Sequence, residues 1–328
     1  MYYQDKIKKM KKLRYICVQP RIMYYTWQVE VMINNFIRNG ISGNDMDILV
    51  AWNPNDLTNS SENIEAWNKL ANKYNYVRFF FYEDSRQQPV HYISSIRPNI
   101  LKQHWLANPE LVDDAIFYHD CDIIFTKPLN FSNKLMDDVW YLSDTNSYIN
   151  YDYIISKGKD VYDKMCEIIG MNPIIPKLMN SNSGGAQYLL KNVDYSFWNK
   201  VEKDCEKLFY EINSLNDIKK KTNSEYHELQ IWCADMWSVL WNAWLMGHET
   251  KVDKDLDFCW ASDNIQSWND SSIFHNAGVT VDMNHLFYKS EFQNKLPYNI
   301  EADKYSKDYC SYNYVSEIIE TSKISCLI

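Results

Sequence analysis

Residues Asp114–Leu129 read DAIFYHDCDIIFTKPL, and this stretch decides which fold the chain is expected to adopt. Its apolar run Ala115–His119 has the length of a buried strand and leads directly into Asp120-Cys-Asp122. Two aspartates at positions i and i+2 face the same side of a locally extended chain. The stretch therefore predicts a buried strand that carries two carboxylates at its carboxyl end.

The residues before this strand alternate between strand and helix patterns. The predicted strands are Leu13–Val18, Asp47–Trp52 and Val77–Tyr82, and the predicted helices are Tyr24–Arg38, Ile64–Tyr74 and Ser94–Leu106. This alternation predicts an α/β, Rossmann-like fold with a mostly parallel central sheet flanked by helices. Ligands of such sheets bind at the carboxyl ends of the strands, where the two aspartates lie.

The second half of the chain is less regular. The predicted strands there are Trp140–Leu142, Ala186–Leu190, Phe258–Ala261 and Ser272–His275, and the predicted helices are Val161–Ile169, Tyr195–Ile212, Glu225–Met246 and Val315–Ser322. Because no linker rich in Pro, Gly or Ser and no repeat interrupts the chain, we expect residues 1–328 to form a single domain.

Composition excludes several classes of protein. The formal net charge of −9 argues against duplex nucleic acid as a partner, and the basic run Lys6–Arg14 is expected to be a solvated segment. No apolar stretch is long enough for a transmembrane segment, and the N-terminus lacks the pattern of a signal peptide. Eight cysteines without a C-x-x-C pair indicate buried thiols in a reducing compartment, so we expect a cytoplasmic protein.

The D-x-D pattern occurs four times, and position distinguishes the copies. Asp45-Met-Asp47 precedes its predicted strand, and the overlapping copies at 253–257 lie in a charged connection. Only Asp120 and Asp122 follow an apolar strand. Mn²⁺ or Mg²⁺ prefers oxygen ligands and bridges carboxylates to phosphates, so this copy predicts a divalent metal site. The alternative is a solvated strand end with two aspartates that favour a turn.

Several motifs resemble those of known sugar-transferring enzymes. DAIFYHDCDIIFTKPL looks like the D-x-D strand of GT-A glycosyltransferases. YTWQVEVMINNF, from Tyr25, and ADMW, from Ala234, resemble segments of plant peptidyl-hydroxyproline arabinosyltransferases and peptidyl-serine galactosyltransferases. SGGAQY, from Ser183, resembles a small-residue loop of this fold. FHNAG, from Phe274, resembles the C-terminal His-x-x-Gly motif.

The resemblance implies a GT-A fold and a metal-dependent glycosyltransferase. Its donor would be a nucleotide-diphosphate sugar, with UDP as the commonest base, and its acceptor a hydroxyl of a glycan, a protein or another molecule. The resemblance favours a retaining mechanism over an inverting one. It also divides the chain into a nucleotide-sugar-binding half (about 12–130), an acceptor and catalytic half (about 131–290) and a C-terminal helical tail (about 291–328).

The candidate site residues follow from motif and position. The metal ligands would be Asp120, Asp122 and His275, since the histidine of His-x-x-Gly completes the metal site in many retaining members. The donor-binding candidates are Gln19, Trp27, Arg97, Asp120, Gly184, Gly185, Gln187 and Lys289. Arg97 and Lys289 can bind the diphosphate, and the glycines allow close backbone approach. Gln19 and Trp27 would lie near the base.

Two acidic residues are candidates for the catalytic step. Asp235 and Glu228 are seven residues apart in the predicted helix Glu225–Met246, on the stripe opposite its tryptophans. An inverting enzyme would use one of them as a general base. A retaining enzyme would use Asp235 to orient the sugar.

Two other functions compete with this interpretation. A metal-dependent nucleotidyltransferase would share the acidic strand end, although Gln19–Arg21 is not the Gly-rich, basic loop typical of that class. A non-catalytic carbohydrate-binding protein would explain the aromatic content of 15% without needing the aspartate pair.

Overall fold

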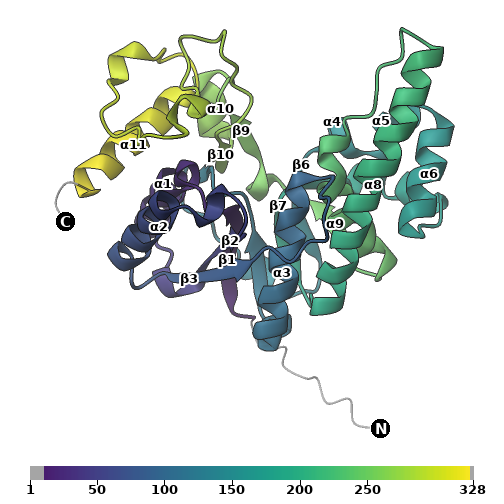
Figure 1. Cartoon of the computed structure of the whole chain (residues 1–328), viewed down its shortest axis with the longest axis horizontal. Coiled ribbons are helices and arrows are strands. Elements are labelled where there is room, and N and C mark those ends of the chain that lie inside the picture. Colours follow the sequence, from purple (N-terminus) through teal and green to yellow (C-terminus); the bar gives the residue numbers. More distant parts are fainter. Residues whose placement is uncertain (1–10, 326–328) are drawn as a thin grey trace.

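The computed structural model describes residues 11–325 and contains a seven-stranded sheet in the order β3-β2-β1-β4-β7-β6-β8 (Figure 1). Strands β3, β2, β1 and β4 are parallel, β7 is antiparallel to both β4 and β6, and β8 is parallel to β6. The predicted mostly parallel α/β sheet is confirmed. The strands are β1 (Leu13–Pro20), β2 (Met46–Trp52), β3 (Arg78–Glu83), β4 (Ala115–Tyr118), β6 (Trp140–Asp144), β7 (Gly184–Lys191) and β8 (Thr250–Val252).

Helices cover both faces of this sheet (Figure 1). The long helices are α1 (Met23–Arg38), α2 (Ser61–Lys73), α3 (Ile96–Ala107), α6 (Lys159–Ile169), α8 (Tyr195–Thr222), α9 (Ala234–Leu245) and α11 (Ser311–Ser325). The short helices are α4 (Asn146–Ile149), α5 (Tyr151–Ser156), α7 (Ile174–Leu178) and α10 (Ile265–Asp270). The predicted helices of the first half therefore start and end within a few residues of the observed ones.

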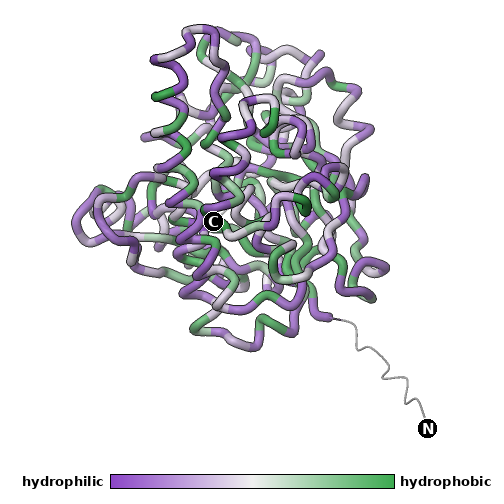
Figure 2. The backbone as a smooth tube through the Cα atoms, turned by 90° about the vertical axis from the view of Figure 1, so that its right-hand side faces the viewer, coloured by the Kyte–Doolittle hydropathy of each residue, from purple (hydrophilic) through white to green (hydrophobic). Residues whose placement is uncertain are grey.

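Alternation along β1 explains why both faces are covered. Ile16 and Val18 pack on the face that carries α3, α8 and α9, whereas Tyr15 and Cys17 pack on the face that carries α1 and α2. Successive side chains of a strand point to opposite faces, so a strand that is apolar at every position needs helices on both. Figure 2 shows hydrophobic and hydrophilic residues alternating along the helices, as expected when each buries one face.

The second half departs from the sequence prediction at several elements, since β8, α4, α5, α7 and α10 were not predicted. The prediction of a helix over Glu225–Met246 is wrong in its first third: a 3₁₀ turn spans Ile231–Cys233, and α9 begins only at Ala234. Glu225, His227, Glu228 and Gln230 are exposed, so this segment has no continuous apolar face to bury. The preceding helix is longer than predicted, because α8 continues to Thr222 with its basic residues in the last turn.

A second sheet lies next to the turn that carries Asp120 and Asp122. It joins β5 (Ile123–Phe125), β10 (Ile273–His275) and β9 (Phe258–Trp260) in that order. β10 is antiparallel to β5 and parallel to β9. The apolar run after Asp122 thus belongs to this small sheet and not to the large one.

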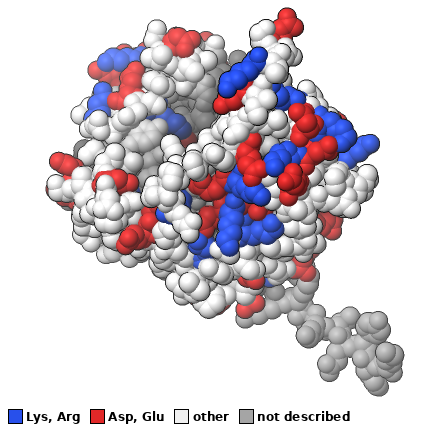
Figure 3. Space-filling view, turned by 45° about the vertical axis from the view of Figure 1, so that its right-hand side comes forward, with Lys and Arg blue, Asp and Glu red and all other residues white. Residues whose placement is uncertain are grey.

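Lys11 and Lys12, at the start of the described residues, contact other parts of the chain. Residues 6–10 of the predicted solvated basic segment lie outside the described residues, but Lys11 donates to Asn192 at 2.8 Å and Lys12 pairs with Asp45 at 3.1 Å. Seven cysteines are buried free thiols. Within residues 11–325, no helix has the length and apolar character needed to span a bilayer. Figure 3 shows acidic and basic side chains interspersed on one face.

Candidate metal centre and cavity

Asp120, Asp122 and His275 converge on one point. The two aspartates lie in the turn between β4 and β5, and His275 is the last residue of β10. The antiparallel register pairs His275 with Ile123, and the Asn276 amide donates to the Asp122 carbonyl at 2.9 Å. One ligand atom from each of the three side chains lies within 4.8 Å of the others. Sheet pairing therefore brings together residues that are far apart in sequence.

The donor set fits a divalent cation. His275 Nε2 lies 3.5 Å from Asp122 Oδ1 and 3.8 Å from Asp120 Oδ2. Two carboxylates and one imidazole are oxygen and nitrogen donors that suit Mn²⁺ and Mg²⁺, and Asp122 and His275 are largely buried. These three residues could hold such an ion and leave its remaining positions open towards the cavity.

Two cationic side chains accompany the carboxylates. Lys289 donates to Asp122 Oδ2, and Arg97 Nη1 lies 2.7 Å from Asp120 Oδ1. Burial alone would raise the pKa of Asp122, but Lys289 and His275 outweigh it and hold the pKa below its usual value. Burial would likewise lower the pKa of Lys289, but Asp122 outweighs it and raises the pKa. Both groups are therefore charged around neutral pH.

Arg97 joins the acidic cluster to Asp235. Its Nη2 and Nε lie 2.6 and 3.1 Å from Asp235 Oδ2, while the Tyr92 hydroxyl lies 2.6 Å from Asp235 Oδ1. Burial raises the pKa of Tyr92, so its phenol stays protonated and can donate. Both oxygens of Asp235 are thus engaged, and its orientation is fixed from two sides.

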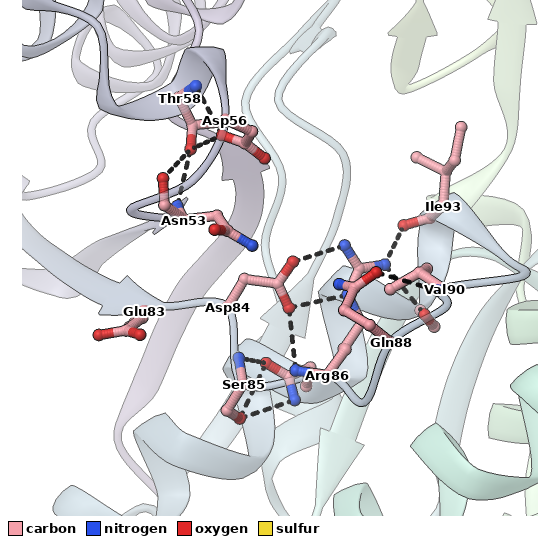
Figure 4. A network of polar contacts seen from close by, with 12 residues as sticks. Asn53, Asp56, Thr58, Glu83, Asp84, Ser85, Arg86, Gln88, Val90 and Ile93 are labelled. Atoms are coloured by element: carbon pink, nitrogen blue, oxygen red, sulfur yellow. Dashed lines mark hydrogen bonds and ion pairs between the residues drawn. The ribbon is translucent and has the colours of Figure 1, made fainter.

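The start of α3, which carries Arg97, is held by a polar network (Figure 4). The Arg86 guanidinium forms an ion pair with Asp84 and donates to the Ile93 carbonyl at 2.9 Å and to Ser95 Oγ at 3.0 Å. These bonds fix the 3₁₀ turn Ile93–Ser95 that precedes the helix. The segment between β3 and α3 is therefore ordered by its own side chains.

The three candidate metal ligands, together with Arg97 and Lys289, line a cavity of about 610 Å³ at the carboxyl ends of β1 and β4. Seven predicted site residues lie on its wall: Gln19, Arg97, Asp120, Asp122, Asp235, His275 and Lys289. The wall also contains aromatic residues that were not among the predicted site residues, namely Tyr24, Tyr25, Tyr118, Tyr148, Tyr188, Trp198, Trp232 and Trp260. Tyr and Trp are so frequent here that no local pattern distinguishes these from core residues.

Trp27 and Gln187 lie away from the cavity, which corrects the prediction that they contact a donor. Trp27 is fully buried and packs edge-on against Phe287 and Phe292, with ring centroids 5.8 and 6.4 Å apart. Because Lys289 belongs to the same 3₁₀ turn as Phe292, Trp27 helps to position that lysine. Gln187 is buried in β7 and accepts a hydrogen bond from Ser143 at 2.7 Å.

Gly184 and Gly185 also have a structural role in place of the predicted donor loop. Both are buried in β7, where β6 and β7 change register. A Cβ at Gly184 would lie 2.6 Å from the Ser143 carbonyl oxygen, so the close approach of β6 and β7 requires glycine at this position. The neighbouring Ala186 has φ 64° and lines the cavity.

Glu228 is the prediction that the structure contradicts most directly. It lies in the exposed segment before α9, not on a helix with Asp235, and pairs with Lys220 on the surface. It does not line the cavity. The assumed helical spacing between Glu228 and Asp235 does not exist, because the helix starts six residues after Glu228.

The other aspartate pairs have structural partners. Asp47 is fully buried in β2, where its carboxylate pairs with Arg78 and lies 3.3 Å from His104. Asp253 and Asp255 pair with Lys134, at 3.2 and 2.5 Å. The choice of the copy at Asp120 by its position after a strand therefore selects the pair that reaches the cavity.

His119 does not line the cavity and stabilises the turn that carries Asp120 and Asp122. Its Nδ1 lies 2.8 Å from the Asp120 carbonyl, and its ring stacks on Phe117 with centroids 5.1 Å apart. Burial lowers the pKa of His119 to about 4, so the ring is neutral and can donate through Nδ1.

Comparisons with known proteins give only distant likenesses. No family model matches the chain, and no curated protein matches its sequence. The apo structure of the WbbM bifunctional glycosyltransferase is similar with 11% identity and a TM-score of 0.47, covering 95% of this chain and 51% of that one, so this chain spans about half of it. Apo mouse xyloside xylosyltransferase 1 has 8% identity and a TM-score of 0.36, covering 81% and 97%.

A third solved structure is a mannosyltransferase, PcManGT from Pyrobaculum calidifontis, in complex with GDP-Man and Mn²⁺. It has 9% identity and a TM-score of 0.31, covering 72% of each chain. All three neighbours are glycosyltransferases. Their TM-scores, from 0.31 to 0.47, mark these likenesses as distant.

Proposed function

We propose that this protein is a metal-dependent glycosyltransferase of the GT-A type that takes a sugar from a nucleotide-diphosphate donor. The observation that carries the proposal is the convergence of Asp120, Asp122 and His275 on the wall of a cavity that also contains Arg97 and Lys289. Such a set suits a divalent ion and a diphosphate together, because carboxylates hold the ion and cations hold the phosphate oxygens.

Asp120, Asp122 and His275 would hold Mn²⁺ or Mg²⁺. When bound, the ion would supply charge stabilisation for the nucleoside diphosphate as it leaves. Arg97 and Lys289 would donate to the phosphate oxygens, and Gln19 lies at the end of β1 on the same wall, within reach of the base. UDP is our first choice of nucleotide, and the residues 12–130 would form the donor half.

Asp235 supports a retaining mechanism in this proposal. A general base needs a carboxylate oxygen that is free to accept the acceptor proton. Arg97 and Tyr92 engage both oxygens of Asp235, so its role is to orient Arg97 and the donor sugar. In a retaining transfer the departing phosphate can take the proton from the acceptor hydroxyl on the same face. That hydroxyl would belong to a glycan, a protein or another molecule entering beside residues of the 131–290 half.

The proposal is tested with a panel of nucleotide sugars, including UDP and GDP donors. Mass spectrometry measures donor hydrolysis with and without Mn²⁺, and calorimetry measures binding of Mn²⁺ with UDP or GDP. We expect metal-dependent binding that Asp122→Asn weakens roughly 100-fold or more, since one ligand oxygen and its charge are lost. Asp255→Asn is the matched control, because Asp255 belongs to a D-x-D pattern outside the cavity and should leave binding unchanged.

Either of two outcomes would contradict the proposed function and favour a different one. Conversion of a nucleotide sugar and added pyrophosphate into a nucleoside triphosphate and a sugar 1-phosphate, without release of free sugar, would favour a nucleotidyltransferase. Sugar binding without any binding of Mn²⁺ and nucleotide would favour a non-catalytic carbohydrate-binding protein. Circular dichroism of each variant separates loss of binding from loss of folding.

A further inference from the structure

Trp232 is exposed although it lines the cavity. Its residue exposure is 54%, and the other eleven of the twelve tryptophans are buried or half-buried. Ile93, which lines the same cavity, is 81% exposed. Leaving a large apolar surface in water costs free energy in proportion to its area, so an exposed indole on a cavity wall indicates a surface that a ligand covers.

The indole is held in one orientation. The Trp232 ring lies against Tyr148 with centroids 6.0 Å apart and planes 28° apart, and its Nε1 donates to Gln230 at 3.3 Å. The Trp232 carbonyl lies 2.5 Å from the Tyr92 hydroxyl, whose single proton is shared between this carbonyl and Asp235 Oδ1. A side chain that is already ordered loses little conformational entropy when a ligand binds, which favours binding.

Polar groups follow this apolar surface along the cavity wall. Tyr92, which anchors the Trp232 backbone, also contacts Asp235, and Asp235 is joined through Arg97 to Asp120. The backbone of Ile93 is fixed as well, since Arg86 donates to its carbonyl (Figure 4). A ligand that covers Trp232 therefore meets hydrogen-bonding groups on the side that faces the metal centre.

We infer that Trp232 and Ile93 form the acceptor subsite and that the acceptor is a carbohydrate, whose terminal ring stacks on the indole. This rests on the proposed function. A pyranose has an apolar C–H face and a rim of hydroxyl groups, which matches one aromatic plane bordered by polar side chains. A lipid chain would need a continuous apolar groove, which Asp235 and Arg97 interrupt. Stacking would hold one acceptor hydroxyl near the donor sugar.

The experiment uses the full chain with ¹⁵N-labelled indoles. The NMR resonance of the Trp232 side chain is assigned by its loss in Trp232→Phe. The probes are the methyl glycosides of glucose, galactose, mannose and N-acetylglucosamine, with Mn²⁺ and UDP or GDP present. We expect at least one glycoside to shift this resonance in a saturable way. Calorimetry with the same glycoside should show binding at least tenfold weaker in Trp232→Ala and partly retained in Trp232→Phe.

Tyr210→Ala is the matched control, because Tyr210 is also 54% exposed but does not line the cavity. It should leave glycoside binding unchanged. Binding of Mn²⁺ with nucleotide should be the same in all three variants. If the wild-type protein binds Mn²⁺ and nucleotide but no glycoside moves the Trp232 resonance, this inference fails alone. If Mn²⁺ and nucleotide do not bind, the proposed function fails. A response only to serine-containing peptides or phosphatidylcholine vesicles would also overturn the carbohydrate assignment.

Discussion

Lys289 and Asp122 form an ion pair on the cavity wall, although 167 residues separate them in sequence. The lysine occupies one oxygen of a carboxylate whose other oxygen faces His275. It therefore neutralises the charge of Asp122. In the proposed enzyme the same ammonium group would turn to the diphosphate once metal and nucleotide enter.

Lys289→Met should consequently change two affinities in opposite directions. Binding of Mn²⁺ alone should strengthen several-fold, because a competing cation is removed. Binding of the nucleotide to the Mn²⁺-loaded protein should weaken about tenfold, because a phosphate contact is lost. Electron paramagnetic resonance of free Mn²⁺ measures the first affinity, and calorimetry measures the second.

Lys304→Met is the control for this prediction, because Lys304 lies on the surface and pairs with Glu301 at 3.3 Å. It should change neither affinity. Two affinities that weaken together in Lys289→Met would contradict the competition between lysine and metal.

The Arg97–Asp235 pair predicts a strongly coupled double mutant. Asp235→Asn should leave binding of Mn²⁺ and nucleotide within about twofold but reduce transfer about 100-fold, since Arg97 loses its second anchor. Arg97→Lys should also reduce transfer, because lysine cannot donate a fork of hydrogen bonds. Their effects should not add, with a coupling energy of about 1–3 kcal/mol in a double-mutant cycle.

Turnover of the panel's best donor measures this cycle. Glu228→Gln should retain full turnover, because Glu228 pairs with Lys220 outside the cavity. Additive effects of the Arg97 and Asp235 variants, or a large loss in Glu228→Gln, would count against the assigned roles.

The two adjacent glycines predict different consequences of the same substitution. Gly184→Ala should lower the free energy of unfolding by about 1–3 kcal/mol, since its Cβ would meet the Ser143 backbone at 2.6 Å. Gly185→Ala would meet the Met236 methyl group and the Tyr188 hydroxyl at 2.8 Å, and the methionine end can move. It should cost less stability but lower turnover, because Met236 and Tyr188 line the cavity.

Urea unfolding and donor turnover of both variants check this contrast. A Gly185→Ala variant that is less stable than Gly184→Ala would show that the Met236 side chain does not move away from the added methyl group.

His248 predicts part of the acid sensitivity of the fold. Its ring stacks on Trp140 with centroids 4.5 Å apart, and burial lowers its pKa despite the charges of Asp138 and Asp194. A base whose pKa is lower in the folded state contributes its full stability above the unfolded pKa of about 6.5. That contribution is lost as the pH falls below this value towards the folded pKa.

Urea unfolding between pH 8 and pH 5 measures this effect. The free energy of unfolding of His248→Phe should fall less steeply with decreasing pH than that of the wild type. Parallel curves for the two proteins would show that His248 does not contribute to the acid sensitivity of the fold.

Local sequence patterns predicted six of the seven strands of the central sheet and the D-x-D turn. Strands such as Leu13–Pro20 and Ala115–Tyr118 are apolar at nearly every position, and helical patterns follow them at short range. These signals are local, because backbone geometry fixes the periodicity of strands and helices. The position of Asp120 and Asp122 after such a strand was enough to separate them from the other aspartate pairs.

Only the tertiary structure decided which residues share the cavity. His275 reaches Asp122 because β10 pairs with β5 in one register, and a shift by one residue would turn its side chain to the other face. The same limit explains the errors at Trp27 and Glu228. The first prediction rested on a motif and the second on an assumed helix, and neither rested on contacts between distant segments. Burial distinguishes Trp232 from the other tryptophans, and burial depends on packing between segments that are distant in the chain.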